Sequence, residues 1–143
     1  MGGFSLGGYM SLAFYRQFPD RVSSLLIIDT GPGFKNDEAR EGWNKYAINS
    51  AEKYENRNLR GIGNAARGML TQKDDRIIKS LPGILVPTLI IVGENDKPFL
   101  SAADYMSNKI KNSKKNIIPD AGHAVNIEQP ELFNSAVLEF LKK

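Results

Sequence analysis

The sequence has no cysteine and a single histidine among its 143 residues. Without cysteine there can be no disulfide scaffold, no thiolate metal site and no cysteine nucleophile. The composition suits a reducing compartment, so we expect a cytoplasmic protein. One histidine also cannot build an all-histidine metal centre. We therefore expect a protein without a metal ion or any other cofactor.

Long apolar runs are missing as well. No run approaches the roughly 18 residues that a membrane span requires. The N-terminus also lacks the charged region and the following apolar region of a secretory signal, because Met1–Ser5 leads directly into a glycine-rich turn. We therefore expect no membrane insertion and no export.

Charge of one sign is only in small excess, since 19 basic and 16 acidic residues leave a net charge of +3. Basic side chains do cluster at Lys109, Lys111, Lys114 and Lys115. No aromatic residues alternate with them, as a surface that stacks nucleic-acid bases would need. We interpret the cluster as a solvated helix end and expect no nucleic-acid partner.

The remaining composition, 41% hydrophobic and 24% charged, is that of one globular domain. Apolar segments of strand length and helix length alternate along the chain. We predict strands over 22–29, 88–92 and 116–118 and helices over 10–18, 99–111 and 130–141. The last helix should present Phe133, Val137, Phe140 and Leu141 on one face. The alternation predicts an α/β fold, a mainly parallel sheet with flanking helices, in a single domain over 1–143.

Residues 35–80 interrupt this alternation. The segment is rich in Asn, Glu, Lys and Arg, and its helical patches are separated by Gly61, Gly63 and Gly68. It is too long for a simple crossover between two strands. We predict a helical lid segment at the carboxyl edge of the sheet, which is where open α/β sheets bind their ligands.

The first chemical motif is the pentapeptide Gly3–Gly7, which has the pattern G-x-S-x-G and is followed at once by an amphipathic helix. A sharp turn that lifts Ser5 above a sheet brings the residues two positions away into tight contact, so glycine is needed on both sides. The helix then directs backbone N–H groups and its positive dipole end to the point where an oxyanion would form. The alternative is a glycine-rich N-cap in which Ser5 only starts the helix.

Two further residues follow predicted strands. Asp96 lies four residues after the strand over 88–92, where a carboxylate points into the ligand edge, and it also suits the N-cap of the next helix. His123 follows the strand over 116–118, although a lone histidine is usually structural.

Serine, acid and histidine in this order, each just past a predicted strand, match the chain order of the α/β-hydrolases and differ from the orders used by chymotrypsin-like and subtilisin-like proteases. The sequence resembles the α/β-hydrolase family, in particular its lid-bearing branch of esterases, lactonases and carbon–carbon hydrolases. The matching stretches are Gly2–Tyr9, Phe18–Val22, Val86–Gly93 with Asp96, and Pro119–His123.

The resemblance implies a serine hydrolase that cleaves small carboxylic esters or related acyl compounds through an acyl-enzyme. It implies that Ser5 is the nucleophile, that His123 is the general base and that Asp96 orients the imidazole. Asp29, at the end of the preceding strand, is the second choice for the acid. The backbone N–H of Leu6 would be one oxyanion donor.

The aromatic residues of the 35–80 segment leave two interpretations open. Trp43, Tyr46 and Tyr54 could line an acyl pocket, or they could pack against one another within an amphipathic lid.

The resemblance covers the carboxyl-terminal half of such an enzyme, beginning at the turn of the nucleophile. Only four residues precede Ser5, and the family's second oxyanion N–H comes from a loop before the nucleophile, so that donor has no source here. The strand over 22–29 would become an exposed edge, which we expect to pair with a second copy of the chain or with a missing amino-terminal half. The alternatives to an active hydrolase are a catalytically impaired binding or interaction module and a truncated fragment of a larger hydrolase.

Overall fold

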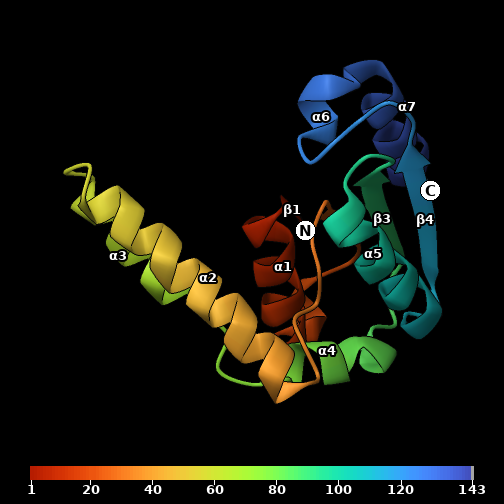
Figure 1. Ribbon diagram of the computed structural model, residues 1–143. Helices are drawn as coiled ribbons and strands as arrows, with labels where there is room; N and C mark the ends of the chain where they lie inside the picture. The colour runs from red at the N-terminus through yellow and green to blue at the C-terminus, as the bar shows by residue number, and fades with distance from the viewer. Residues whose placement is uncertain (143) are drawn as a thin grey trace. The chain divides into compact units, whose positions relative to one another are not determined.

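A computed structural model describes residues 1–142 of the chain. The chain divides into two compact units, of which the first combines residues 1–32 with the segment from Ser80 onward, and the second is Gly33–Lys79. Figure 1 shows the elements of both units.

The first unit is built on a sheet of four parallel strands in the order β1-β2-β3-β4. The strands are β1 (Gly2–Phe4), β2 (Leu25–Ile28), β3 (Thr88–Gly93) and β4 (Ser113–Ile118). In register, Phe4 pairs with Ile28, Ile28 with Ile91, and Gly93 with Ile118. Because the strands are parallel, all of their carboxyl ends lie at one edge of the sheet.

Helices flank this sheet. They are α1 (Leu6–Gln17), α5 (Lys97–Lys109) and α7 (Pro130–Leu141), with the short helical turns η1 (Pro19–Arg21), η3 (Leu81–Gly83) and α6 (Val125–Glu128). α1 packs against β1 and β2, α5 against β3 and β4, and α7 against β4 (Figure 1). Pro130 starts α7 well, because the first position of a helix needs no N–H donor.

The central strands are apolar along their length because both faces of the sheet are covered. Ile28, Leu89 and Ile91 pack into one cluster with the side chains of α7. The intervening Ile27 and Ile90 face the opposite way and are also buried. The prediction that the last helix presents one apolar face is confirmed for Phe133, Val137 and Phe140, which pack against this cluster. It is wrong for the final leucine of α7, which is 58% exposed.

The second unit is helical. Its elements are α2 (Asp37–Glu55), α3 (Arg60–Ala65), the π-helical turn η2 (Ala66–Leu70) and α4 (Arg76–Ser80), which runs to the boundary with the first unit. The Asn36 side chain caps α2 by accepting hydrogen bonds from two amides of its first turn, at 2.7 and 3.2 Å. Arg67 donates two hydrogen bonds of 3.0 Å to Glu55, which ties η2 to α2. Within residues 1–142, no helix is both long enough and apolar enough to cross a membrane.

The basic cluster lies partly on a strand. β4 begins at Ser113, earlier than predicted, so Lys114 and Lys115 lie on this strand and their assignment to a helix end was wrong. Charged side chains are tolerated there because β4 is an edge strand of the described sheet and is only partly buried, and lysine at such an edge discourages pairing with another strand. Lys114 Nζ lies 2.7 Å from a carboxylate oxygen of Glu139, and Lys115 forms an ion pair with Asp104.

The edge of the sheet next to β1 also differs from the prediction. β2 pairs with β1 on one side and with β3 on the other, so the expectation that residues 22–29 form an exposed edge was wrong. The reason is that Gly2–Phe4 forms a strand despite the low strand propensity of glycine. The Leu26 amide donates to the Met1 carbonyl oxygen at 2.9 Å, and β1, like β4, is an edge strand of the described sheet.

Candidate active site

Ser5 stands in the sharp turn between β1 and α1. Its φ of 52° lies in the left-handed region that L-residues rarely adopt. The Ser5 N–H donates to the Ile28 carbonyl oxygen at 2.8 Å, which holds the turn at the end of β2. Ser5 occupies the N-cap position of α1, yet its side chain makes no capping hydrogen bond. The strained backbone and the lack of a capping hydrogen bond to the hydroxyl both favour a chemical role over a capping role.

The neighbouring glycines explain how this turn fits. A Cβ on Gly3 would lie 2.1 Å from the carbonyl carbon of Gly7, and one on Gly8 would lie 2.4 Å from Cγ2 of Thr30, both far inside van der Waals contact. A Cβ on Gly7 would meet no atom within 4 Å. The prediction that sterics require glycine is therefore confirmed at Gly3 and wrong at Gly7. On the helix side of Ser5, the residue that must be glycine is Gly8.

Asp96 follows β3 and occupies the N-cap position of α5. Its side chain is buried and makes no capping hydrogen bond to the helix. Instead, its Oδ2 atom lies 2.9 Å from Nδ1 of His123. The position is thus that of a cap, whereas the carboxylate is directed to the imidazole.

His123 lies in the turn after β4, and its two ring nitrogens have different partners. Nδ1 faces Asp96, and Nε2 lies 3.0 Å from Oγ of Ser5. The structure therefore brings Ser5, His123 and Asp96 into one hydrogen-bonded line. In such a line the imidazole can accept the hydroxyl proton while the carboxylate stabilises the resulting positive charge. The imidazole side chain remains 44% exposed, so a small molecule can reach it.

Two aromatic rings flank the imidazole of His123. The Phe99 ring, from the first turn of α5, stacks on it with centroids 5.2 Å apart and 26° between the planes. The Phe4 ring, at the end of β1, lies 5.1 Å away at 48°. The two rings restrict rotation of the imidazole, and their faces can stabilise a positive charge on it. Sequence reasoning missed Phe99, since nothing in the start of a helix shows that a residue faces the histidine.

Glu128, in α6, holds the turn that carries His123. Its Oε2 accepts a hydrogen bond of 2.8 Å from the Gly122 amide, and its Oε1 accepts one of 2.9 Å from the Ala124 amide. These amides lie on either side of His123, so one carboxylate fixes both ends of the residue. Sequence reasoning missed Glu128 as well, and its position five residues after the histidine is the only signal that could have drawn attention to it.

Asp29, the second choice for the acid, lies at the end of β2 and is fully buried. Its Oδ1 accepts a hydrogen bond of 2.9 Å from the Gly93 amide, and its Oδ2 has no hydrogen-bond partner among the described residues. Burial raises the pKa of Asp29 to about 6, and the nearby Asp96 adds to the rise. Asp96, and not Asp29, contacts the imidazole nitrogen.

Leu6 is the first residue of α1. An N–H at this position has no acceptor inside the helix, and the positive end of the helix dipole lies there. The amide next to a serine nucleophile is well suited to stabilise an oxyanion. The assignment of Leu6 as an oxyanion donor stays a prediction.

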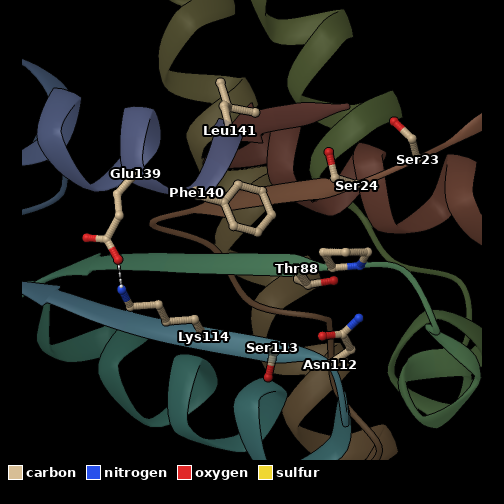
Figure 2. Close-up of a pocket in the computed structure, with 10 residues that line it drawn as sticks. Ser23, Ser24, Thr88, Asn112, Ser113, Lys114, Glu139, Phe140 and Leu141 are labelled. Atoms are coloured by element: carbon tan, nitrogen blue, oxygen red, sulfur yellow. Dashed lines mark hydrogen bonds and ion pairs between the residues drawn. The ribbon is translucent and has the colours of Figure 1, made fainter. Parts of the chain in front are cut away.

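The opposite edge of the sheet holds a cavity of about 480 Å³ (Figure 2). Ser24, Thr88 and Ser113 line it, and each lies where a strand begins, so the cavity is separate from the Ser5 site. Figure 2 shows the ion pair of Lys114 and Glu139 at its margin. Over residues 1–142, no group of three or more His, Cys, Asp or Glu side chains could hold a metal ion.

Two of the three aromatic residues singled out in the second unit, Trp43 and Tyr46, contact their own segment. Trp43 Nε1 donates to the Leu70 carbonyl oxygen at 2.7 Å, and the Trp43 ring lies 5.7 Å from that of Tyr46 and 6.0 Å from that of Phe34. These contacts favour packing within the segment. A role of Tyr54 or of these rings in an acyl pocket stays a prediction.

No family model matches the chain. Among curated proteins, it is 30% identical over 175 residues to the putative 2-succinyl-6-hydroxy-2,4-cyclohexadiene-1-carboxylate synthase of Bacillus subtilis (strain 168), an alignment that covers 97% of this chain and 64% of the relative. It is 25% identical over 167 residues to the carboxylesterase YbfK of the same organism, covering 99% of this chain and 56% of the relative. The chain therefore spans less than two thirds of the length of these relatives.

Among solved structures, the chain is similar to MenH from S. aureus. The TM-score is 0.87 at 25% sequence identity, and the match covers 99% of this chain and 66% of that chain. The agreement includes the parallel sheet, its flanking helices and nearly every residue of the chain. By sequence and by fold, the chain belongs to the α/β-hydrolase family.

Proposed function

We propose that this chain is a serine hydrolase that cleaves small carboxylic esters or related acyl compounds through an acyl-enzyme. In this proposal Ser5 is the nucleophile, His123 is the general base and Asp96 orients the imidazole. The observation that carries it is the hydrogen-bonded line in which Ser5 Oγ, His123 and Asp96 are joined over 3.0 and 2.9 Å. The name of one relative, a carboxylesterase, agrees with this reaction class.

In the first half of the proposed reaction, Ser5 Oγ attacks the carbonyl carbon of the ester while His123 Nε2 takes the hydroxyl proton. Asp96 stabilises the imidazolium that forms, because its carboxylate lies against the Nδ1 side of the ring. The Leu6 N–H would donate to the oxyanion of the tetrahedral intermediate. The imidazolium then gives its proton to the departing alkoxide, which leaves as an alcohol.

In the second half, a water molecule attacks the carbonyl carbon of the acyl-enzyme and His123 takes one of its protons. The bond to Ser5 Oγ breaks, the proton returns to the serine oxygen, and the carboxylic acid leaves. The exposed imidazole gives water the access that this step needs.

A fluorophosphonate probe tests the proposal directly, because it forms a covalent bond only with an activated serine. We expect labelling of the wild-type chain at Ser5 and none of the Ser5→Ala variant. Ser23→Ala is the matched control, since Ser23 is an exposed serine before β2, away from the site, and its loss should leave labelling unchanged. A folded wild-type chain that stays unlabelled would contradict the proposal.

A catalytically impaired binding or interaction module is the alternative, and p-nitrophenyl acetate distinguishes it. Hydrolysis that depends on the proposed base should fall to the background rate in His123→Ala. Hydrolysis that survives this substitution unchanged would come from nonspecific surface groups and would favour the alternative.

The proposal includes two further expectations, a lid role for residues 35–80 and a cytoplasmic location for the protein. We propose that this segment is a lid, on the ground that Gly33–Lys79 forms a compact unit distinct from the sheet. Trp43→Ala should then change the preference between acetate and butyrate esters more than it changes the rate with acetate. The cytoplasmic location continues to depend on the lack of cysteine.

The proposed pairing with a second copy or an amino-terminal half concerns the edge beside β1. β1 is a three-residue strand that pairs on one side only in the described sheet, and Phe4 at its end is 40% exposed. Unpaired backbone groups at such an edge favour the addition of a strand. Light scattering over a wide concentration range should show self-association. A chain that stays strictly monomeric would contradict the proposal that two copies pair at this edge.

A further inference from the structure

Asp29 is a buried carboxyl group that the proposed mechanism leaves without a role. Its side chain is fully buried, Oδ1 accepts one hydrogen bond from the Gly93 amide, and Oδ2 lacks a partner in the described part of the chain. A buried carboxylate oxygen without a donor destabilises a fold. Asp29 also has a φ of 42°, an unfavourable backbone conformation for a residue with a side chain. Both costs are located at the edge of the sheet that holds Ser5.

The hydrogen bond from Gly93 places Asp29 beneath the turn of Asp96. Gly93 is the last residue of β3, and its carbonyl oxygen accepts a hydrogen bond of 3.0 Å from the Asp96 amide. A Cβ on Gly93 would lie 2.2 Å from the Gly122 carbonyl oxygen and 2.5 Å from that of Ala121, so the strand end is pressed against the turn of the histidine. Asp29 therefore fixes the point where the two turns meet.

Few charged groups face Asp29. Asp96 from the β3–α5 turn and His123 from the β4–α6 turn act on its charge. Of the other charged groups near these turns, Glu94 accepts a hydrogen bond from the Asp120 amide and Glu128 binds the amides that flank the histidine. Asp120 and Lys97 are exposed to solvent. The N-terminus of α1 also lies at this edge, but the one charged residue of α1, Arg16, lies in its last turn.

The charge state of Asp29 changes near neutral pH. Burial is the largest cause of the rise of its pKa to about 6, and the charge of Asp96 also raises it. The Gly93 amide, which donates to Oδ1, acts most strongly in the opposite direction. The Val125 amide, which lies near the carboxyl group without making a hydrogen bond of normal geometry to Oδ2, and the charge of His123 act in the same direction as Gly93. Asp29 is thus mostly protonated at pH 5 and mostly ionised at pH 8.

We propose that Asp29 is a positioning residue for the Asp96–His123 pair, which joins their two turns through Gly93 and, when ionised, adds a second negative charge at the strand end that packs against the turn of the histidine. Asp29 neither gives nor receives a proton in the reaction. Its charge favours the imidazolium that exists only while His123 holds the proton from Ser5. The effect on rate depends on the proposed function, whereas the effect on the imidazole does not.

Asp29→Asn separates this role from a purely structural one. The asparagine is isosteric and its oxygen still accepts the hydrogen bond from Gly93, but it cannot ionise. Because the chain contains one histidine, the Cε1–H resonance of His123 identifies itself in a proton spectrum. We expect the titration of this resonance in Asp29→Asn to move to lower pH by about 0.3 to 1 unit. The control is Asp20→Asn, since Asp20 is exposed in η1 and its substitution should leave the titration unchanged. Equal titrations in the wild type and in Asp29→Asn would overturn the proposal.

A second measurement needs no variant. In the ¹³C-labelled wild-type chain, the side-chain carboxyl carbon of Asp29 should titrate near pH 6, and the His123 resonance should show a second inflection at the same pH. Failure of Asp29→Asn to fold therefore leaves the proposal testable. An Asp29 titration with no matching inflection of His123 would overturn it.

Probe labelling then separates the proposal from the proposed function. If the wild type labels, Asp29→Asn should label about threefold to tenfold more slowly at pH 8 and within about twofold of the wild type at pH 5. Equal rates at both pH values would contradict the charge role. If the wild type does not label but the imidazole titration moves as expected, the proposed function fails and the role of Asp29 toward the imidazole stands.

Discussion

The carboxylate of Asp96 lies 2.9 Å from Nδ1 of His123 and makes no hydrogen bond to the helix that Asp96 begins. An aspartate at an N-cap usually stabilises its helix by accepting from an amide of the first turn. Here the side chain is directed across to another loop, so substitution of Asp96 should affect chemistry far more than stability.

Asp96→Asn should reduce the rate of fluorophosphonate labelling by a large factor, on the order of 10⁴ where the reaction follows the serine–histidine–acid scheme. The amide cannot stabilise the imidazolium, and it favours the wrong tautomer of His123. The free energy of unfolding should change by less than about 1 kcal/mol, since no cap is lost. Labelling kinetics and urea denaturation of the same preparation check both parts. A variant that labels like the wild type would show that Asp96 is not the acid.

Glu128→Ala should slow labelling by about 10- to 100-fold, because both amides that hold His123 in place lose their acceptor. Glu128→Gln offers one carbonyl oxygen in place of two carboxylate oxygens, so its rate should be intermediate. The change in unfolding free energy should stay below about 1.5 kcal/mol, since the group is exposed. Glu131→Ala, an exposed acid in the first turn of α7, is the matched control and should label normally.

Phe99→Ala should slow labelling by about threefold to tenfold, the loss expected for one aromatic contact of 0.5–1.5 kcal/mol. The same substitution removes the ring current of Phe99, so the Cε1–H resonance of His123 should shift. Phe99→Leu should keep the apolar contact, but it should lose the ring-current contribution to the chemical shift of the His123 Cε1–H. Phe18→Ala is the control, because Phe18 is 48% exposed and packs against Phe14 away from the imidazole. An unshifted resonance in Phe99→Ala would contradict the stacked arrangement.

The stability of the fold should depend on pH through Asp29. Its pKa is raised from 3.8 to about 6, so between these values the native state binds more protons than the unfolded state. Stability from this group is therefore present below about pH 4 and is lost as pH rises to about 6, with a total of up to about 3 kcal/mol. Urea denaturation at pH 4, 5, 6 and 7 should show that Asp29→Asn lacks this decrease. Parallel curves for the two proteins would show that Asp29 ionises equally easily in both states.

The parts of the fold that sequence predicts well are those with local signals. Helix α1 follows from the spacing of apolar residues up to Pro19, and β3 follows from five consecutive apolar or β-branched residues over 88–92. The chain order of Ser5, Asp96 and His123 locates the three side chains because each follows a strand of a parallel sheet, and such strands end at one edge.

The parts that sequence misses depend on contacts between distant residues. The strand at Gly2–Phe4 has no local strand signal and exists because the backbone of β2 pairs with it. Sequence spacing also cannot show that Glu128 turns back to the amides beside His123. The partnerless oxygen of Asp29 is equally invisible, since its cost arises from burial that only the folded sheet creates.

The hydrogen bond between Ser5 and His123 joins residues 118 positions apart in a chain of 143. Contacts of such long range form late in folding, because the loop between them must be ordered first. A chain still being made on a ribosome has Ser5 long before it has His123, so under the proposed mechanism its serine would not yet be activated. Covalent labelling of Ser5 would thus report completed folding, and counting labelled molecules would measure how much of a preparation has reached the native sheet.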